Sequence, residues 1–435
     1  MTERADRTVG PRTKGLRLGL PRPLHDVRAE LTAAPHRLDG PDFAWPILTL
    51  DAARLDHNLR LMAAACQQYG VWHAPHVKTA MSEDIWRRQA EVGAWAATVA
   101  TAQQLRTVRD WGASRVLLAN ELVDRRELAW VMADLAGHTG CELYLEVDSV
   151  DGANRLIEGA AQLGEAARQR LCPLIEVGSP GGRTGVRLGP TAVELAHRLT
   201  AGGLVVAGVI GYEGPVAAGT SPDALAAIGA WVDQVVAIAT DVSDVVGSAA
   251  RLTGPPRPFV VSLGGSGYLD VILPKLGALA ARGWWPVVRA GAYVSHDHGH
   301  YAELNPWARL PGEASLQPAL AVWAEVLSRP EPGLALLGAG RRDVDYDLAL
   351  PHPLWWRRPD ASGRLGQANG LSPTTHIREL NDQHAFLVCD PTADALAPGD
   401  VVGLGISHPC TAFDKWQLAA LVDGDIVVDL YPLDF

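Results

Sequence analysis

The fold of this chain is decided by the segment Val71-Trp72-His73-Ala74-Pro75-His76-Val77-Lys78-Thr79. An apolar run here ends on Lys78, and strand-like and helix-like units alternate from it to about residue 295. A strand that finishes on a lysine places an amine at the rim of its sheet. Beside His76 and Trp72 this amine can be partly desolvated, which lowers its pKa and leaves it free for imine formation. A solvated loop lysine is the simpler interpretation, and this setting argues against it.

Eight strand-like runs follow from this segment, and helical character follows each one. They end near Lys78, Ala100, Asn120, Asp148, Gly178, Glu213, Leu263 and Val294. Alternating strands and helices predict a parallel sheet, and eight such units that close on themselves form a (β/α)8 barrel. The span 71–295 matches the usual length of that barrel. An open, doubly wound sheet has the same local pattern and remains the alternative.

Composition divides the chain into three parts. Residues 1–45 are rich in Arg, Pro and Gly, so we expect a loosely ordered arm that drapes over another part of the fold. Residues 46–300 would form the barrel. Residues 301–435 would form a mainly β domain, with Trp355 and Trp356 on its loops. Its expected strands lie near 319–327, 334–338, 385–388, 401–406 and 426–430.

Bulk properties exclude several classes of protein. The chain has 435 residues, more than one core usually supports, and its 48% hydrophobic and 20% charged residues are ordinary for a globular enzyme. A net charge of −11 argues against a nucleic-acid partner. We find no run of about 18 apolar residues, so we expect no membrane span.

The cysteines and the start of the chain favour a cytoplasmic protein. The five cysteines are odd in number and scattered, which is unlike a disulfide framework. They are Cys66, Cys141, Cys172, Cys389 and Cys410. The polar, basic residues 1–19 include no apolar core, so we expect no secretory signal.

Polar residues gather where the predicted strands end, which is where a barrel of this type carries its active site. They include Asn120, Glu176, Arg183, Tyr212, Glu213, Arg289, Tyr293 and Asp297. The turn Gly264-Gly265-Ser266-Gly267 follows the seventh strand and precedes a helical segment. Its backbone N–H groups would therefore converge on an anion, and barrels often bind phosphate at this place. The turn lacks the spacing of a dinucleotide fingerprint.

Two segments could bind a metal ion. In an extended chain, His296, His298 and His300 would face one way, although a polar strand end with exposed histidines is an equal alternative. In the β domain, His408 and Cys410 could both reach one borderline ion such as zinc. A histidine two residues before a cysteine is common by chance, so this pattern needs support from its context.

Six motifs occur in the order seen in the D-serine dehydratase / D-threonine aldolase family. They are Pro75-His76-Val77-Lys78-Thr79, Arg183-Thr184-Gly185, Tyr212-Glu213-Gly214, Gly264-Gly265-Ser266-Gly267, Arg289-Ala290-Gly291-Ala292-Tyr293 and His408-Pro409-Cys410. From about residue 45 to its end, the chain resembles these fold-type III pyridoxal-phosphate enzymes, relatives of alanine racemase. The resemblance also implies that the strand near 47–50 joins the β domain and leaves eight strands for the barrel.

The resemblance assigns roles around the cofactor ring. It implies that the amine of Lys78 binds pyridoxal 5'-phosphate covalently and that Arg183 approaches the cofactor's phenolic oxygen. Tyr212 would line the ring or the substrate pocket. Either Arg289 or Tyr293 would lie near the pyridine side.

The resemblance also assigns the phosphate and the metal. Gly265, Ser266 and Gly267 would hold the phosphate. His408 and Cys410 match the metal pair of the family, which is His with Cys in dehydratases and more often His with Asp in aldolases. The expected metal is a divalent ion, with Zn²⁺ as the first candidate.

The chain departs from the family pattern near its lysine. Ala80 and Met81 stand where other members carry a His and a Lys, and Ala74 stands where an arginine is common. This indicates a side branch of the family, so the substrate's side chain stays open.

The reaction expected from the resemblance is the dehydration and deamination of a D-β-hydroxy amino acid to a 2-oxo acid and ammonia. In it, Lys78 removes the α-proton and a metal on His408 and Cys410 assists the departure of hydroxide. Retro-aldol cleavage is the alternative, and racemisation comes third. A different class is a non-catalytic pyridoxal-phosphate-binding protein, although such proteins lack the β domain. The expected partner is a small amino acid, and a homodimer is expected from the family alone.

Overall fold

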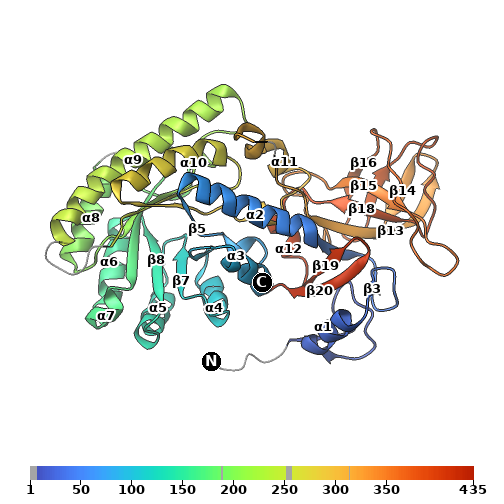
Figure 1. Ribbon diagram of the computed structural model, residues 1–435, viewed down its shortest axis with the longest axis horizontal. Coiled ribbons are helices and arrows are strands. Elements are labelled where there is room, and N and C mark those ends of the chain that lie inside the picture. Colours follow the sequence, from blue (N-terminus) through green and yellow to red (C-terminus); the bar gives the residue numbers. More distant parts are fainter. Residues whose placement is uncertain (1–6, 188–189, 251–256, 313) are drawn as a thin grey trace.

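The structure is a computed structural model that describes residues 7–187, 190–250, 257–312 and 314–435. Figure 1 shows two parts, a barrel with helices around its outside and a β-rich part built mostly from the last third of the chain. The first sheet has eight strands in the order β5-β12-β11-β10-β9-β8-β7-β6. Each neighbouring pair in that order is parallel.

The eight strands close into a barrel. They are β5 (Trp72–His73), β6 (Ala97–Val99), β7 (Arg115–Leu118), β8 (Glu142–Val147), β9 (Leu171–Val177), β10 (Gly208–Gly211), β11 (Val260–Leu263) and β12 (Trp285–Val288). A parallel bridge between His76 and Thr98 joins the continuation of β5 to β6. The N–H of Thr98 also donates to the carbonyl of Pro75 over 2.9 Å. The (β/α)8 prediction is therefore confirmed and the open sheet is excluded.

Helices cover the outer face of the barrel. They are α2 (Ala52–Tyr69), α3 (Glu83–Glu91), α4 (Ala102–Asp110), α5 (Arg125–Gly137), α6 (Val150–Ala160), α7 (Glu165–Arg168), α8 (Thr191–Ala201), α9 (Pro222–Ala250) and α10 (Leu269–Gly277). In α2 the side chain of Asp51 accepts from the N–H of Arg54 and caps the first turn. Gly70, with φ of 65°, ends the helix in the left-handed conformation that glycine adopts without strain.

Helix α9 corrects the expectation about membrane spans. The segment Pro222–Gly247 of this helix is long and apolar enough to cross a membrane, and 39% of its apolar stretch is buried inside the structure. The sequence analysis missed it because isolated aspartates interrupt the apolar run. Ile228, Trp231 and Val235 are buried, so the apolar character of α9 has a place in the packing of the barrel. A helix in the core of a soluble protein can have the same length and apolar composition.

The second sheet has the order β16-β17-β14-β13-β4-β19-β20-β3, and β18 joins β13 to β15. Its strands are β3 (His36–Arg37), β4 (Ile47–Asp51), β13 (Leu320–Glu331), β14 (Leu334–Leu337), β15 (His352–Arg357), β16 (His376–Leu380), β17 (Ala385–Val388), β18 (Val401–Gly405), β19 (Leu418–Asp423) and β20 (Ile426–Pro432). Strand β4 pairs with β13 and with β19, so it belongs to this sheet.

Strand β15 was wrongly expected to be a loop. Trp355 and Trp356 lie in it, opposite Gly403 and Val402 of β18. A Cβ atom at Gly403 would lie 2.4 Å from the Trp355 ring, so only glycine leaves room for that ring. Pro351 and Pro353 suggested a turn, but Pro353 lies within the strand, where β15 has an irregular register.

Residues 7–45 of the N-terminal segment form regular elements that pack on the rest of the fold, contrary to the expectation of loose order, and residues 1–6 lie outside the described residues. The segment contains β1 (Thr8–Val9), β2 (Arg22–Pro23) and α1 (Leu24–Ala33). The buried side chains of α1 belong to a hydrophobic cluster shared with β20. Arg28 donates to the carboxylates of Asp84 and Asp429 and so ties α1 to α3 and β20. The absence of sequence periodicity reflected short elements rather than disorder.

Candidate active site

Lys78 lies on η1 (Val77–Thr79), the short 3-10 turn that follows β5. Burial lowers the pKa of its amine. The positive charges of Arg183 and Arg289 act in the same direction, and negative charge on Cys410 or Glu146, when these groups are ionised, opposes them. A reactive amine therefore lies among residues of both parts of the fold, in place of the solvated loop lysine that the sequence left as an alternative.

Arg183, a charged neighbour of this amine, stacks on the ring of Tyr212. The guanidinium carbon of Arg183 lies 5.7 Å from the centre of the Tyr212 ring. The ring rests on two glycines, because a Cβ atom would come within 2.4 Å of it at Gly214 and 2.8 Å at Gly265. Burial raises the pKa of the Tyr212 hydroxyl to about 12. The phenol is therefore neutral at physiological pH and can donate a hydrogen bond.

The glycine turn after β11 is partly occupied by a side chain of the protein. The carboxylate of Glu213 accepts the N–H of Gly264 over 3.1 Å and that of Gly265 over 2.7 Å. The sequence analysis did not anticipate this contact, which takes the N–H of Gly265 away from an incoming anion. No hydrogen bond in the described part of the chain uses the N–H groups of Ser266 and Gly267, so these two remain for a phosphate.

The structure separates the two candidates for the pyridine side. Arg289 is buried and donates to the Ser262 carbonyl and hydroxyl over 2.9 and 2.8 Å, and to the Gly211 carbonyl over 2.7 Å. Tyr293 points elsewhere. Its hydroxyl accepts from Gln89 of α3 over 3.1 Å, and its ring packs at 5.1 Å against His73. Arg289 is therefore a charged neighbour of Lys78, whereas Tyr293 packs against α3 and β5.

His408 and Cys410 reach the mouth of the barrel from the start of α12 (Pro409–Phe413). The thiol of Cys410 donates to the Thr79 hydroxyl over 3.4 Å, one residue from Lys78. The Nδ1 atom of His408 lies 2.7 Å from Oδ2 of Asp347. Burial opposes protonation, but hydrogen bonds with Cys410 and Asp347 raise the pKa of His408 to about 9. The imidazole and the thiol are thus adjacent.

The loop before α12 is fixed by a buried carboxylate. Oδ2 of Asp345 accepts the N–H of Ser407 over 3.1 Å, the N–H of His408 over 2.7 Å and the hydroxyl of Ser407. The Thr411 hydroxyl donates to Oδ1 of Asp347 over 2.7 Å. Two aspartates therefore hold the backbone and the side chain of His408.

The three histidines that follow β12 do not converge. The segment turns around Asp297, whose carboxylate accepts the N–H groups of Gly299, Tyr301 and Ala302. The His298 ring packs on Gly405, whereas His300 lies near His408. Within the described residues, no three His, Cys, Asp or Glu side chains are grouped to hold a metal ion. The prediction of a three-histidine site is wrong because the chain there is not extended.

Two residues of this site escaped the sequence analysis. Burial raises the pKa of Tyr301, and its electrostatic neighbours Cys410 and Tyr212 raise it further, so Tyr301 belongs to the same site. Glu146 is buried on β8, with Arg289 and Arg183 as charged neighbours. Its signal was available, because Tyr144, Glu146 and Asp148 alternate along one face of β8.

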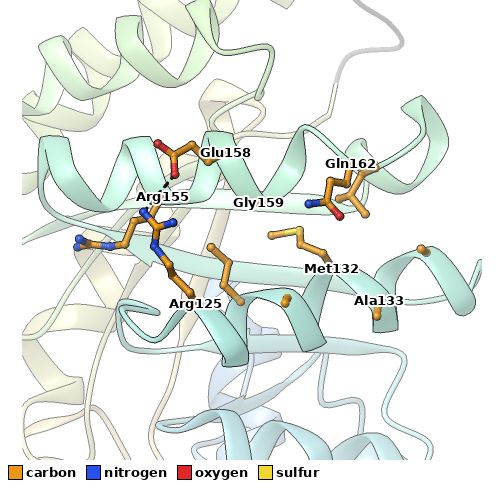
Figure 2. Close-up of a pocket in the computed structure, with 11 residues that line it drawn as sticks. Arg125, Met132, Ala133, Arg155, Glu158, Gly159 and Gln162 are labelled. Atoms are coloured by element: carbon orange, nitrogen blue, oxygen red, sulfur yellow. Dashed lines mark ion pairs between the residues drawn. The ribbon is translucent and has the colours of Figure 1, made fainter.

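Two surface grooves lie apart from this mouth. Figure 2 shows one of about 460 Å³ between α5 and α6, where Arg125 and Glu158 form an ion pair of 3.6 Å. The other, of about 480 Å³, is lined by residues around Trp72 at the start of β5. Neither groove contains a residue of the predicted site.

Comparison with known proteins identifies two domains. Residues 50–268 match the family "Alanine racemase, N-terminal domain", and residues 319–422 match the "Putative serine dehydratase domain". D-threonine aldolase of Arthrobacter sp is 26% identical over 392 residues, covering 89% of this chain and 91% of the relative. D-threo-3-hydroxyaspartate dehydratase of Delftia sp. (strain HT23) is 29% identical over 360 residues, covering 82% and 86%.

Solved structures share the fold. D-threonine aldolase from Filomicrobium marinum superimposes with a TM-score of 0.71 at 24% identity, covering 90% of this chain and 95% of that one. The Delftia dehydratase gives 0.68 at 24% identity, covering 90% and 97%. The family match spans residues 50–268, half of the chain, and with the second domain it shows that the chain belongs to the alanine racemase-like family of fold-type III pyridoxal-phosphate enzymes.

Proposed function

We propose that this protein is a pyridoxal-phosphate-dependent lyase that converts a D-β-hydroxy amino acid into a 2-oxo acid and ammonia. The observation that carries the proposal is the 3.4 Å contact between Cys410 and Thr79, because it sets the His408–Cys410 pair beside the amine of Lys78. A base for the α-proton and a site for the β-hydroxyl can therefore face the same substrate. The similarity to D-threo-3-hydroxyaspartate dehydratase supports the same reaction class.

The residues at the mouth fit pyridoxal phosphate. Lys78 offers an amine whose pKa is lowered by burial, and Arg289 offers a buried positive charge. The N–H groups of Ser266 and Gly267 suit a phosphate, as unpaired backbone donors before a helix do. When bound, the cofactor supplies an electron sink that makes the hydrogen on Cα acidic.

Lys78 is the proposed base. Its lowered pKa raises the share of neutral amine near neutral pH, and the neutral form is the one that can accept a proton. With the substrate's amine in the place of Lys78 on the cofactor, Nζ would be a free amine that takes the proton from Cα, and the electron pair released there would form the Cα–Cβ double bond as hydroxide leaves Cβ. Hydrolysis of the resulting enamine gives the 2-oxo acid and ammonia.

His408 and Cys410 fit a divalent metal ion, and we propose Zn²⁺. The carboxylate of Asp347 accepts a hydrogen bond from Nδ1–H of His408, which leaves Nε2 for the metal, as is usual for metal-bound histidine. Cys410 provides a thiolate, a ligand that favours zinc. The ion would supply Lewis-acid assistance at the substrate's β-oxygen. Two protein ligands leave the remaining positions open to solvent or substrate.

Retro-aldol cleavage is the second candidate. It is favoured by the similarity to D-threonine aldolase and to 3-hydroxy-D-aspartate aldolase of Paracoccus denitrificans (strain Pd 1222), which is 25% identical over 383 residues. In this reaction the β-hydroxyl loses its proton and the Cα–Cβ bond breaks. The same metal pair would assist it, so the products must decide.

Product analysis tests the proposal. The purified protein, supplied with pyridoxal phosphate and Zn²⁺, is offered D-serine, D-threonine and D-threo-3-hydroxyaspartate, with the L isomers as controls. Elimination gives ammonia with pyruvate, 2-oxobutyrate or oxaloacetate. If glycine and an aldehyde are formed instead, the reaction is retro-aldol cleavage and the proposal of dehydration is wrong. Interconversion of D and L isomers without either product set would overturn both.

A further inference from the structure

The inner face of the barrel ends in a polar layer. Side chains alternate along a strand, so the residue two positions beyond a buried lumen residue also faces the lumen. Ala74, Tyr144, Leu174, Val260 and Val287 belong to the apolar cluster inside the barrel. The residues two positions further toward the mouth are His76, Glu146, Glu176, Ser262 and Arg289. The chain continues from His76 of this layer into η1, which carries Lys78, and Arg289 and Glu146 of the layer are charged neighbours of its amine.

Most members of this layer have partners. Arg289 donates to Ser262 and to the Gly211 carbonyl. Glu176 accepts from the Thr184 hydroxyl over 2.7 Å. Two members lack such a partner among the described residues: Nδ1 of His76 is buried without a hydrogen bond, and no hydrogen bond or ion pair involves the carboxyl group of Glu146, which is only 5% exposed. A buried carboxyl group without a partner is costly, so it points to a group that the protein alone does not provide.

Five charged or titratable groups face Glu146 from different segments. Arg289 follows β12, Arg183 lies in the loop after β9, Glu176 lies on β9 and Asp148 ends its own strand. Lys78 faces it from η1. Burial, followed by the charge of Glu176, raises the pKa of Glu146 to about 8. At neutral pH the carboxyl is therefore mostly protonated and carries an O–H donor.

We infer that Glu146 is a further cofactor-contacting residue, whose carboxyl group hydrogen-bonds the bound pyridoxal phosphate from the inside of the barrel. The inference rests on the proposed cofactor, and it adds a contact that the motifs of the family did not supply. The protonated form donates to the cofactor. Loss of that proton places a negative charge beside the ring and beside Arg289.

A spectroscopic titration tests this inference. The holoprotein is titrated from pH 6 to pH 10 while its visible absorbance is recorded, and the dissociation constant of pyridoxal phosphate is measured separately. We expect the wild-type spectrum to change with a midpoint near the pKa of Glu146, about 8. Glu146→Gln removes the titrating proton and keeps the size of the side chain, so this change should vanish while affinity stays within about threefold.

Glu146→Ala removes the hydrogen bond altogether, and we expect it to weaken pyridoxal phosphate binding about tenfold. Glu142→Gln is the matched control, because Glu142 lies at the other end of the same strand, where it accepts from Arg115 over 2.7 Å. Its spectrum should titrate as in the wild type. If Glu146→Ala does not fold, the isosteric Gln variant still decides the question.

The outcomes separate this inference from the proposed cofactor. A wild-type protein that binds no pyridoxal phosphate contradicts the cofactor and the inference together. A wild-type protein that binds it, together with a Glu146→Gln variant that titrates identically, overturns the role of Glu146 alone.

Discussion

The thiol of Cys410 donates a hydrogen bond to the hydroxyl of Thr79 over 3.4 Å, across 331 positions of the chain. This contact joins α12 of the β domain to η1 of the barrel, next to Lys78. The amine and the proposed metal pair therefore come from different domains. The active mouth exists only when both domains are folded and in contact.

Replacing Lys78 tests its role as the residue that carries the cofactor. We expect Lys78→Ala to lack the visible absorbance of the wild-type holoprotein and to lose all lyase activity. The measurement is a spectrum after removal of free pyridoxal phosphate. Lys275→Ala is the control, since Lys275 lies on α10 and pairs with Asp233 of α9. A Lys78→Ala protein that keeps the band unchanged would exclude this assignment.

The metal pair should be separable from the cofactor. We expect His408→Ala and Cys410→Ala to lose bound zinc, measured by elemental analysis, and to keep the cofactor's absorbance. Asp347→Asn should weaken zinc binding by roughly 10- to 100-fold, because the aspartate orients the His408 ring. Cys141→Ala, at the amino end of β8, is the control. Equal zinc contents in all of these proteins would place the metal elsewhere.

Glu213 should stabilise the conformation of the glycine turn at residues 264–267, whose last two N–H groups are proposed to bind the phosphate. Its carboxylate accepts two backbone N–H groups, and the amide of Glu213→Gln can accept with only one oxygen. We expect the variant to bind pyridoxal phosphate about tenfold more weakly, a loss of ~1.4 kcal/mol. The dissociation constant measured by fluorescence checks this. Unchanged affinity would mean that the turn keeps its shape without the carboxylate.

The charge of Arg183 should control the reactivity of Lys78. Only the neutral amine combines with the cofactor, so the rate of cofactor uptake at saturating concentration rises with pH through the pKa of Lys78. The positive charge of Arg183 lowers that pKa, so its removal raises it. We therefore expect the rate profile of Arg183→Met to move to higher pH. A profile that stays in place, or moves to lower pH, contradicts this coupling.

The packing of β15 on β18 gives a prediction about stability. A Cβ atom at Gly403 would lie 2.4 Å from the Trp355 ring. We expect Gly403→Ala to lower the free energy of unfolding by about 1–3 kcal/mol, measured by urea denaturation. At Gly333 the nearest atom is 3.6 Å away, so Gly333→Ala serves as the control. Equal stability of the two variants would show that the sheet adjusts freely.

The sequence predicted the barrel because each strand carried a clear local signal, and it predicted the residues at the strand ends because the architecture fixes where they go. Arg289 and Tyr293 show where that reasoning stops. Arg289 lies two residues after Val287 of β12, so its side chain points to the inside of the barrel as that of Val287 does. Tyr293 lies on η3 (Ala292–Val294), where the alternation of the strand no longer applies.

Contacts between distant segments could not be read from local patterns. The hydrogen bonds that the N–H groups of Gly264 and Gly265 donate to Glu213 join the ends of β10 and β11, and no periodicity in the sequence predicts them. The room for Trp355 depends on Gly403 on another strand. Glu146 is different, because its alternation with Tyr144 was visible and was overlooked in favour of motif residues.

The closure of the barrel at β5 bears on how the protein responds to its cofactor. β5 has only two residues and two register pairs with β12, and its continuation meets β6 through the His76 bridge and the hydrogen bond from Thr98 to Pro75, whereas β8 and β9 share five register pairs. The reactive lysine thus follows the strand with the sparsest backbone pairing. A cofactor bound both to Lys78 and to the loop after β11 would connect the short strand β5 to the rest of the barrel. The protein should therefore resist heat better when enough vitamin B6 is available to fill the site.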